Sequence, residues 1–244
     1  MAQLYDRIGK NYAQYRKTDR RIAQSIVDAL GDARSVVNIG AGTGGYEPTD
    51  RSVVAVEPSQ TMIAQRVAGA APVVRASAMD LPFSDGAFDA ALAILTLHHW
   101  PDAMRGLHEM ARVARRWVIL TWEEPQTDFW LTRNYLPHFL ETDRALFPPW
   151  FRNHPGVLDV HAVPIPHDCE DGFFCAYWRR PEAYLDPDVQ GAISTFSRVG
   201  NFELGIEKLR QDLADGSWKK RNRELLAKTE MDLGYRLVIG EGRT

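Results

Sequence analysis

The sequence of 244 residues has few of the side chains from which disulfide scaffolds and metal sites are built. Its two cysteines, Cys169 and Cys175, are too few for the disulfide framework of a small secreted domain, so we expect free thiols in a reducing compartment. The seven histidines form no H-x-x-x-H pair, and the cysteines form no C-x-x-C pair. Because the usual ligand spacings are missing, the sequence predicts no metal site.

The sequence also lacks a strong charge of one sign and a long apolar run. Its formal net charge is −3, which gives no broad electrostatic reason to bind nucleic acid or an anionic membrane. No apolar run approaches the roughly 18 residues that span a bilayer, and the first residues lack the apolar centre of a signal peptide. We therefore expect a cytoplasmic protein whose partner is a small molecule, with no nucleic acid and no membrane. Its oligomeric state stays open.

What the first half does contain is an alternation of strands and helices. A helical pattern over residues 19–30 precedes the first strand, and Gly31 is placed to end it. Short apolar runs predict strands over residues 36–39, 52–56, 73–76, 88–97 and 117–122. Helical spacing predicts helices over residues 58–68 and 103–114. This alternation favours an α/β fold with a parallel sheet covered on both faces.

The second half has a different rhythm. Residues 123–155 are rich in aromatic residues and proline, which predicts helices and loops. Residues 157–165 alternate like a strand, residues 189–232 look helical, and residues 235–239 supply a last strand. The second half also holds many large aromatic side chains, which form the core of an accessory cap or, in a few cases, line a pocket. They are Trp130, Tyr135, Phe139, Trp150, Phe151, Phe173, Phe174, Tyr177 and Trp178.

A glycine-rich turn lies between the first two predicted strands, within the stretch VVNIGAGTGGYEPTDRSVVAVEPS. Gly40, Gly42 and Gly45 match the G-x-G-x-x-G fingerprint of a dinucleotide site. The same turn can also be aligned as G-x-G-x-G through Gly44, which suits S-adenosylmethionine (SAM). The glycines alone do not decide between the two.

The ordered motifs around this turn resemble the class I SAM-dependent methyltransferases, particularly the methyltransferase type 11 group. The similarity lies in VVNIGAGTG, in VVAVEPS, and in ASAMDLPFSDGAFDAALAILTLHHW, and it covers about Tyr5 to Trp122. The most specific part is LPFSDGAFD followed by LHH, which a dehydrogenase is not expected to carry. The resemblance therefore favours the SAM interpretation of the turn.

The resemblance implies a Rossmann-like seven-stranded sheet, mostly parallel with an antiparallel C-terminal strand, plus a helical cap. Residues 1–122 would form the SAM-binding core with an N-terminal helical lid. Residues 123–234 would form the cap segments with one sheet strand, and residues 235–244 would return to the sheet. The implied activity is methyl transfer (EC 2.1.1.-) from SAM to an unidentified small-molecule acceptor, with S-adenosyl-L-homocysteine (SAH) as product.

Residue chemistry fits several of the implied cofactor contacts. Glu57 ends a strand at the edge where open α/β sheets bind ligands, and its two oxygens can accept from the vicinal ribose hydroxyls. Gly40 and Gly42 lack Cβ atoms, so that the backbone can approach the ribose and methionyl groups. An Arg16 guanidinium suits the carboxylate of SAM. The full implied set is Tyr12, Tyr15, Arg16, Asn38, Gly40, Ala41, Gly42, Glu57, Pro58, Met62, Ser77, Ala78, Met79, Ile94 and Leu95. Met62 could also be an ordinary core residue, and the two tyrosines could equally pack on the core.

This sequence departs from the family pattern at three places. Ser77 stands where the family usually has Asp, and Asn38 stands where it prefers an acidic residue before the glycines. Only twelve residues separate Gly44 from Glu57, and Pro48 interrupts them, so the helix that normally follows the glycine turn is expected to be reduced.

The catalytic residues are less determined than the cofactor residues. Methyl transfer needs a base only if the acceptor loses a proton, and otherwise depends on positioning and on exclusion of water. His98 and His167 are the candidate bases, although His98 could be a structural residue at a strand end and His167 part of a solvated loop. An NAD-dependent oxidoreductase and a SAM-binding module without turnover remain as alternatives.

Overall fold

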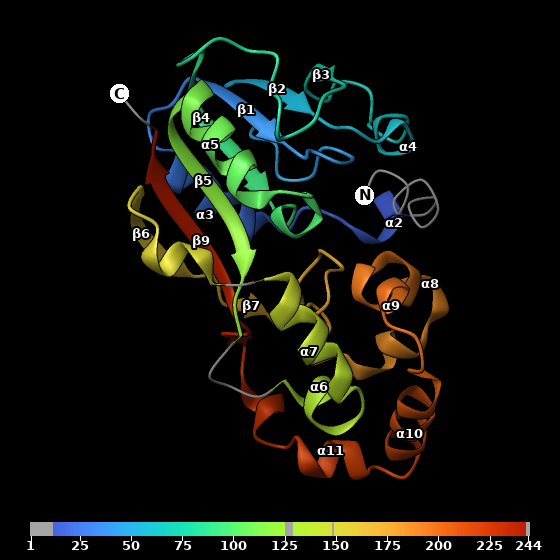
Figure 1. The fold of residues 1–244 in the computed structure, drawn as a ribbon. Helices are drawn as coiled ribbons and strands as arrows, with labels where there is room; N and C mark the ends of the chain where they lie inside the picture. The colour runs from blue at the N-terminus through green and yellow to red at the C-terminus, as the bar shows by residue number, and fades with distance from the viewer. Residues whose placement is uncertain (1–11, 125–128, 148, 243–244) are drawn as a thin grey trace.

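The computed structural model describes residues 12–124, 129–147 and 149–242. Its centre is a seven-stranded sheet with the order β3-β2-β1-β4-β5-β9-β6 (Figure 1). The strands are β1 (Ser35–Ile39), β2 (Ser52–Val56), β3 (Val73–Val74), β4 (Phe88–Ile94), β5 (Ala114–Trp122), β6 (Val157–Ala162) and β9 (Tyr235–Glu241). Strands β1 to β5 pair in parallel, whereas β9 runs antiparallel to both β5 and β6. The predicted fold class is confirmed.

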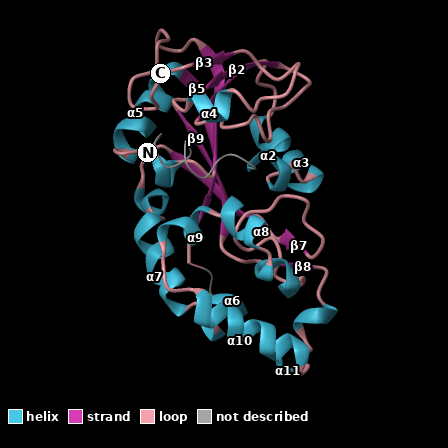
Figure 2. Ribbon diagram, turned by 90° about the vertical axis from the view of Figure 1, so that its right-hand side faces the viewer, coloured by secondary structure: helices cyan, strands magenta, loops and turns pink. Residues whose placement is uncertain are grey.

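Helices cover both faces of this sheet, as Figure 2 shows with the sheet seen close to edge-on. Helix α3 (Arg20–Leu30) follows the short α2 (Tyr12–Tyr15) on one side, and α5 (Ala103–Val113) lies on the other. Helix α3 begins at Asp19, whose carboxylate accepts from the Arg21 amide at 3.0 Å. No helix in the described part of the chain is both long enough and apolar enough to cross a bilayer.

Alternate residues of the central strands belong to two apolar clusters, one on each face of the sheet. On β4, Ala90 and Leu92 belong to one cluster, and Ala91 and Ala93 to the other. The first cluster does not stop at the sheet: it continues through Trp122 into the cap. The cap therefore shares its core with one face of the sheet.

The cap lies beyond the carboxyl ends of β4 and β5, in the lower half of Figure 1. It comprises α6 (Trp130–Asn134), α7 (Pro137–Leu146), α8 (Pro187–Ala192), α9 (Ser194–Arg198), α10 (Glu203–Ala214) and α11 (Ser217–Arg221), with short 3₁₀ turns and the strand pair β7 (Ile165–Pro166) and β8 (Glu230–Met231). Trp130 and Trp178 are fully buried, and the Trp130 indole donates to the Trp178 carbonyl at 2.7 Å. Most of the predicted aromatic side chains form this core; the side chain of Trp150 lies outside the described residues.

Several predicted strands have different ends in the structure, and the two largest differences have a physical reason. The predicted strand over residues 157–165 is two elements: β6 ends at Ala162 after pairing with β9, and Ile165 pairs with Met231 in the small second sheet. The 157–165 and 235–239 segments pair directly, with Val160 opposite Val238. Strand β4 stops at Ile94 because the next residue, Leu95, takes a positive φ of 48° that cannot continue a strand.

The predicted helix over residues 58–68 is reduced to α4 (Gln60–Ile63). Just beyond it, Arg66 turns inward, where its guanidinium donates to both carboxylate oxygens of Glu47 at 2.8 Å. This ion pair is almost fully buried, so it holds the chain in the shape that ends the helix.

Strand β9 offers a test of how tightly its neighbours pack. A Cβ atom built on Gly240 would lie 2.0 Å from Trp117 Cζ2 and 2.4 Å from the Gly156 carbonyl oxygen. We expect Gly240→Ala to destabilise the protein by about 1–3 kcal/mol through overpacking, measured by urea denaturation. The matched control is Gly191→Ala on α8, which meets no atom within 4 Å and should be neutral or slightly stabilising. Equal stability of the two variants would contradict this packing.

Candidate functional site

A cavity opens at the carboxyl ends of β1, β2 and β4, the edge at which open α/β sheets bind ligands. Most of the residues predicted to bind the cofactor line it. They are Arg16, Asn38, Gly40, Ala41, Gly42, Glu57, Pro58, Met62, Ser77, Ala78, Met79, Ile94 and Leu95. One wall thus comes from the glycine turn, one from the end of β2, and one from the end of β4.

The glycine turn is fixed by contacts within the protein. The amides of Gly40 and Ala41 both donate to the Val56 carbonyl, at 2.8 and 3.0 Å. Gly40 has a φ of 71°, and a Cβ atom there would lie 2.1 Å from the Thr96 hydroxyl oxygen. Gly40 is therefore required for packing against Thr96, which differs from the expected role of leaving room for a cofactor. Gly42 has a φ of 54° and faces the Met62 methyl group.

The Glu57 carboxylate stands at the end of β2 and is 7% exposed. One oxygen accepts from the Gly42 amide at 2.9 Å and the other from the Ser59 amide at 2.8 Å. Ser59 in turn begins α4, with its hydroxyl accepting from the Met62 amide at 3.3 Å. The carboxylate therefore holds the glycine turn and α4 together while it lines the cavity.

Asn38 presents an unpaired acceptor to the same cavity. Its side chain is 1% exposed, and its Nδ2 donates to Glu47 at 3.2 Å, beside the Glu47–Arg66 ion pair. Its Oδ1 has no hydrogen-bond partner among the described residues. A buried amide oxygen that accepts no hydrogen bond destabilises the folded protein. This atom is therefore suited to accept a hydrogen bond from a ligand.

An ion pair closes the cavity on the cap side. The Arg16 guanidinium donates to both oxygens of Asp171, at 2.6 and 3.3 Å. The Tyr46 hydroxyl donates to Asp171 as well, at 3.0 Å. Burial, with the neighbouring Asp171 charge, raises the pKa of Tyr46 far above its ordinary value, so the phenol stays protonated. The contact joins the N-terminal segment, the glycine turn and the cap.

The end of β4 carries two adjacent imidazoles in the 3₁₀ turn Leu97–His99. His99 Nδ1 lies 2.8 Å from Arg198 Nη2, and since arginine only donates, Nδ1 accepts and the proton is on Nε2. Burial, assisted by the Arg198 and Arg16 charges, lowers the pKa of His99 to about 3. His99 is therefore neutral at pH 7.

His98 faces away from the first cavity into a second, smaller one. Its ring packs on those of His99 and Phe147, with centroids 3.7 and 4.2 Å away. Its Nδ1 is buried without a hydrogen-bond partner among the described residues, and burial keeps its pKa well below the ordinary value. The second cavity shares Arg16, Leu95 and His99 with the first.

Two predicted residues are not brought to this site, and a third is not tested. His167 lies in the turn directly after β7, where its Nδ1 is 3.1 Å from the Thr229 carbonyl, and it lines neither cavity. Tyr15 lines a surface groove beside Asp168 instead. The side chain of Tyr12 lies outside the described residues.

The cavity also has walls that the predicted cofactor set did not include. These are Lys17, Thr43, Gly45, Tyr46, Ser59, Thr96, His99, Trp100, Pro101 and Asp171. Most are chain neighbours of predicted residues, so a wider window around each motif would have found them. Asp171 reaches the site through its pairing with Arg16, 155 positions away. Within the described residues, no group of three His, Cys, Asp or Glu side chains is placed to hold a metal ion.

Comparison with known proteins gives the same family from sequence and from structure. The family model for a methyltransferase domain matches residues 37–121. A crystal structure from Anabaena variabilis, of a protein assigned as a methyltransferase of an antibiotic biosynthesis pathway, is 32% identical with a TM-score of 0.85. That alignment covers 93% of this chain and 99% of the other.

Two curated relatives match over less than half of this chain. O-methyltransferase resE of Aspergillus sclerotiorum is 40% identical over 96 residues, covering 38% of this chain and 36% of the relative. Demethylmenaquinone methyltransferase of Mycolicibacterium vanbaalenii is 36% identical over 107 residues, covering 43% and 44%. The chain thus spans less than half the length of these two relatives. With its glycine turn, its acidic β2 end and its sheet order, the chain belongs to the class I SAM-dependent methyltransferases, in the methyltransferase type 11 group.

Proposed function

We propose that this chain binds SAM in the cavity at the carboxyl ends of β1, β2 and β4 and transfers its methyl group to a small-molecule acceptor (EC 2.1.1.-), releasing SAH. The observation that carries the proposal is the Glu57 carboxylate, which two backbone amides hold rigidly at the cavity wall beside Met62. A fixed carboxylate at this position suits the paired hydroxyls of a ribose.

The remaining walls fit the other parts of SAM. Among the described residues Asn38 Oδ1 is a buried acceptor without a donor, and the methionyl ammonium would supply one. Met62 and the segment Ser77–Met79 supply the apolar surface that would enclose the adenine. When bound, SAM supplies a methyl group on a sulfonium, which leaves as part of a neutral sulfide.

The protein's own part is to position the reactants and to exclude water. The Arg16–Asp171 pair closes the cap side of the cavity. His99 is neutral, and its proton is on Nε2, the ring nitrogen that does not bond Arg198. The closed arrangement supports a role for residues 123–234 as a cap over the core of residues 1–122, with residues 235–244 completing the sheet. A dimerisation role for the cap is the alternative.

The acceptor would be a small molecule. The second cavity shares a wall with the cofactor cavity and is lined by several aromatic side chains together with a few polar groups, which suits a compact organic molecule better than a polymer. The curated relatives named as an O-methyltransferase and as a demethylmenaquinone methyltransferase support the same class of acceptor.

The first prediction concerns the choice of cofactor. We expect SAM and SAH to raise the melting temperature by an amount that grows with ligand concentration, because they bind only the folded state. NAD should produce no comparable shift. Micromolar binding of NAD by calorimetry, together with no SAM or SAH binding, would point to an oxidoreductase instead.

The second prediction separates the two ends of the cofactor. Glu57→Ala removes charged acceptors from the ribose, so it should weaken SAH roughly ten- to a hundredfold. It should weaken 5′-methylthioadenosine, which keeps the ribose but lacks the amino-acid part, by a similar factor. Because Glu57 also holds the glycine turn, the unliganded variant is first checked for a cooperative melting transition. Unchanged affinity for both ligands in a folded variant would reject Glu57 as the ribose ligand.

A third prediction uses the same two ligands on Asn38→Ala. Removal of the Oδ1 acceptor should weaken SAH about tenfold, since the ammonium loses a charged hydrogen bond. The affinity for 5′-methylthioadenosine should stay within about twofold of wild type, because that ligand has no ammonium. Equal losses for both ligands would mean that Asn38 acts only through the fold.

A further inference from the structure

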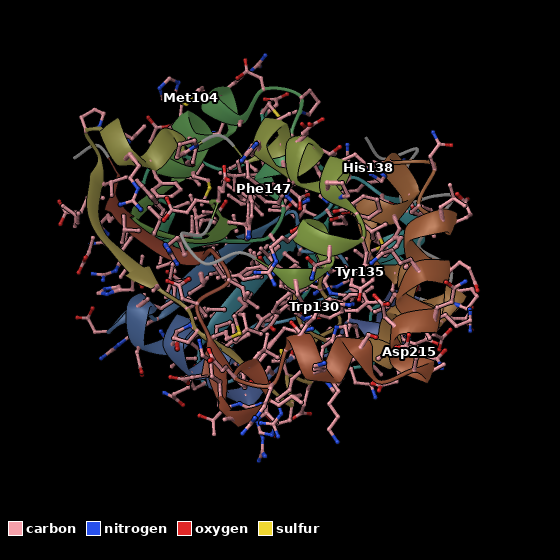
Figure 3. All side chains as sticks on the ribbon, turned by 90° about the horizontal axis from the view of Figure 1, so that it is seen from below. Met104, Trp130, Tyr135, His138, Phe147 and Asp215 are labelled. Carbon is pink, nitrogen blue, oxygen red and sulfur yellow. The ribbon has the colours of Figure 1, made fainter. Side chains whose placement is uncertain are left out.

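The second cavity contains a buried carboxyl group that the cofactor proposal does not use. Asp143 lies on α7, one turn before Phe147, whose ring packs on His98. Its side chain and those of His98 and Phe147 line the same cavity, which adjoins the cofactor cavity at Leu95. Figure 3 places Phe147 toward the middle of the molecule, between the cap helices and the elements that cover the sheet.

Asp143 is poorly compensated for its burial. The residue is 5% exposed, and within the described part of the chain its side-chain partner is the Thr195 hydroxyl, which donates to Oδ1 at 3.2 Å. Burial raises the pKa of Asp143 to about 7, although the bond from Thr195 lowers it. A buried carboxyl with one neutral donor costs stability. An incoming donor on a ligand would offset that cost.

The charged and titratable groups around Asp143 limit which kind of ligand its carboxyl group would bind. Arg16, which is paired with Asp171, lines the cavity, and the Arg198 guanidinium bonds His99 at its wall. His98 and His99 are neutral at pH 7, and burial keeps Cys175 and Tyr235, the other titratable groups that face Asp143, protonated. Positive neighbours disfavour a cationic amine and stabilise negative charge that develops on a hydroxyl oxygen.

The cavity walls add a shape requirement. Phe147, Phe173, Phe174 and Trp122 present aromatic surface on several sides. Asp143, Trp122 and Phe174 also border a third, mainly apolar cavity between α6, α7 and β5. A flat apolar molecule would fit between these rings, with an apolar extension away from the cofactor.

We propose that Asp143 is an acceptor-binding catalytic residue that receives the hydroxyl of a flat, largely apolar acceptor, such as a phenol. This inference rests on the proposed SAM-dependent function. As the hydroxyl oxygen forms its bond to the methyl carbon, the carbon–sulfur bond breaks and its electron pair stays on sulfur. The hydroxyl proton passes to the Asp143 carboxylate, which later releases it to water. The products are the methyl ether, SAH and one proton.

The test uses the whole chain saturated with SAH and simple aromatic probes followed by NMR titration. We expect 4-methylphenol to bind at least tenfold tighter than toluene, because only the phenol offers a donor to Asp143. Benzylamine, which is cationic at pH 7, should bind more weakly than 4-methylphenol. Tighter binding of benzylamine, or no 4-methylphenol binding at millimolar concentration, would overturn the inference.

The decisive variant is Asp143→Asn, in which the amide oxygen can still accept from Thr195. It should weaken 4-methylphenol about tenfold and leave toluene and SAH within about twofold. The matched control is Asp215→Asn, an exposed aspartate at the edge of the cap in Figure 3, which should change none of these affinities. Equal 4-methylphenol binding by wild type and Asp143→Asn would overturn the inference. If the wild-type protein does not bind SAH, the proposed function itself would be rejected.

A pH series gives a measurement that does not depend on the variant folding. Wild-type affinity for 4-methylphenol should rise as pH increases through about 7, where Asp143 becomes an acceptor-only carboxylate. The pKa of Asp143 in the folded protein lies above its ordinary value, so between about pH 4 and 7 the folded state binds more protons than the unfolded state. The stability that protonated Asp143 contributes is therefore lost as pH rises through 7. Phenol affinity that is flat from pH 5.5 to 8.5 would contradict a titrating carboxyl in contact with the hydroxyl.

Discussion

One apolar core runs from a face of the sheet into the cap, and the position of both cavities depends on it. Trp122 at the end of β5 packs into this core, and its indole donates to the Leu233 carbonyl at 2.8 Å. Because the cap shares this core, a shift of the cap as an independent domain would separate the rings of Trp122 and Phe147, whose centroids lie 5.7 Å apart. The cavities lie at this boundary, so side chains from both halves of the chain meet at fixed distances.

Charge is arranged around that boundary in a way that keeps the interior nearly neutral. The buried Asp171 is paired with Arg16, and the buried Glu47 with Arg66. The imidazoles of His98 and His99 are held uncharged by burial and by neighbouring arginines. Asp143 is the exception, since a hydroxyl is its only partner in the described part of the chain. A site with few mobile charges is suited to a reaction in which the leaving group departs neutral.

Sequence patterns predicted the elements whose signal is local. The glycine turn, the acidic end of β2 and the LHH turn follow from short motifs, and the alternation of strands and helices indicated the fold. Other features depend on contacts between distant segments. The roles of Asp143 and Asp171 could not be predicted, because α7 and the loop after β7 reach the site only through the packing of the cap. The inward turn of Arg66 likewise depends on Glu47, 19 positions away.

Leu95 lies on the wall that the two cavities share, together with Arg16 and His99, and it holds a left-handed backbone conformation with its amide bonded to the Leu120 carbonyl at 2.8 Å. Because the two cavities share these residues, a single molecule could occupy both compartments with only a short linker. Such a bisubstrate ligand would gain affinity from both ends, since binding of one end raises the effective concentration of the other. Its selectivity would come from the cap end, because the family match ends at residue 121 and the cap walls lie beyond it.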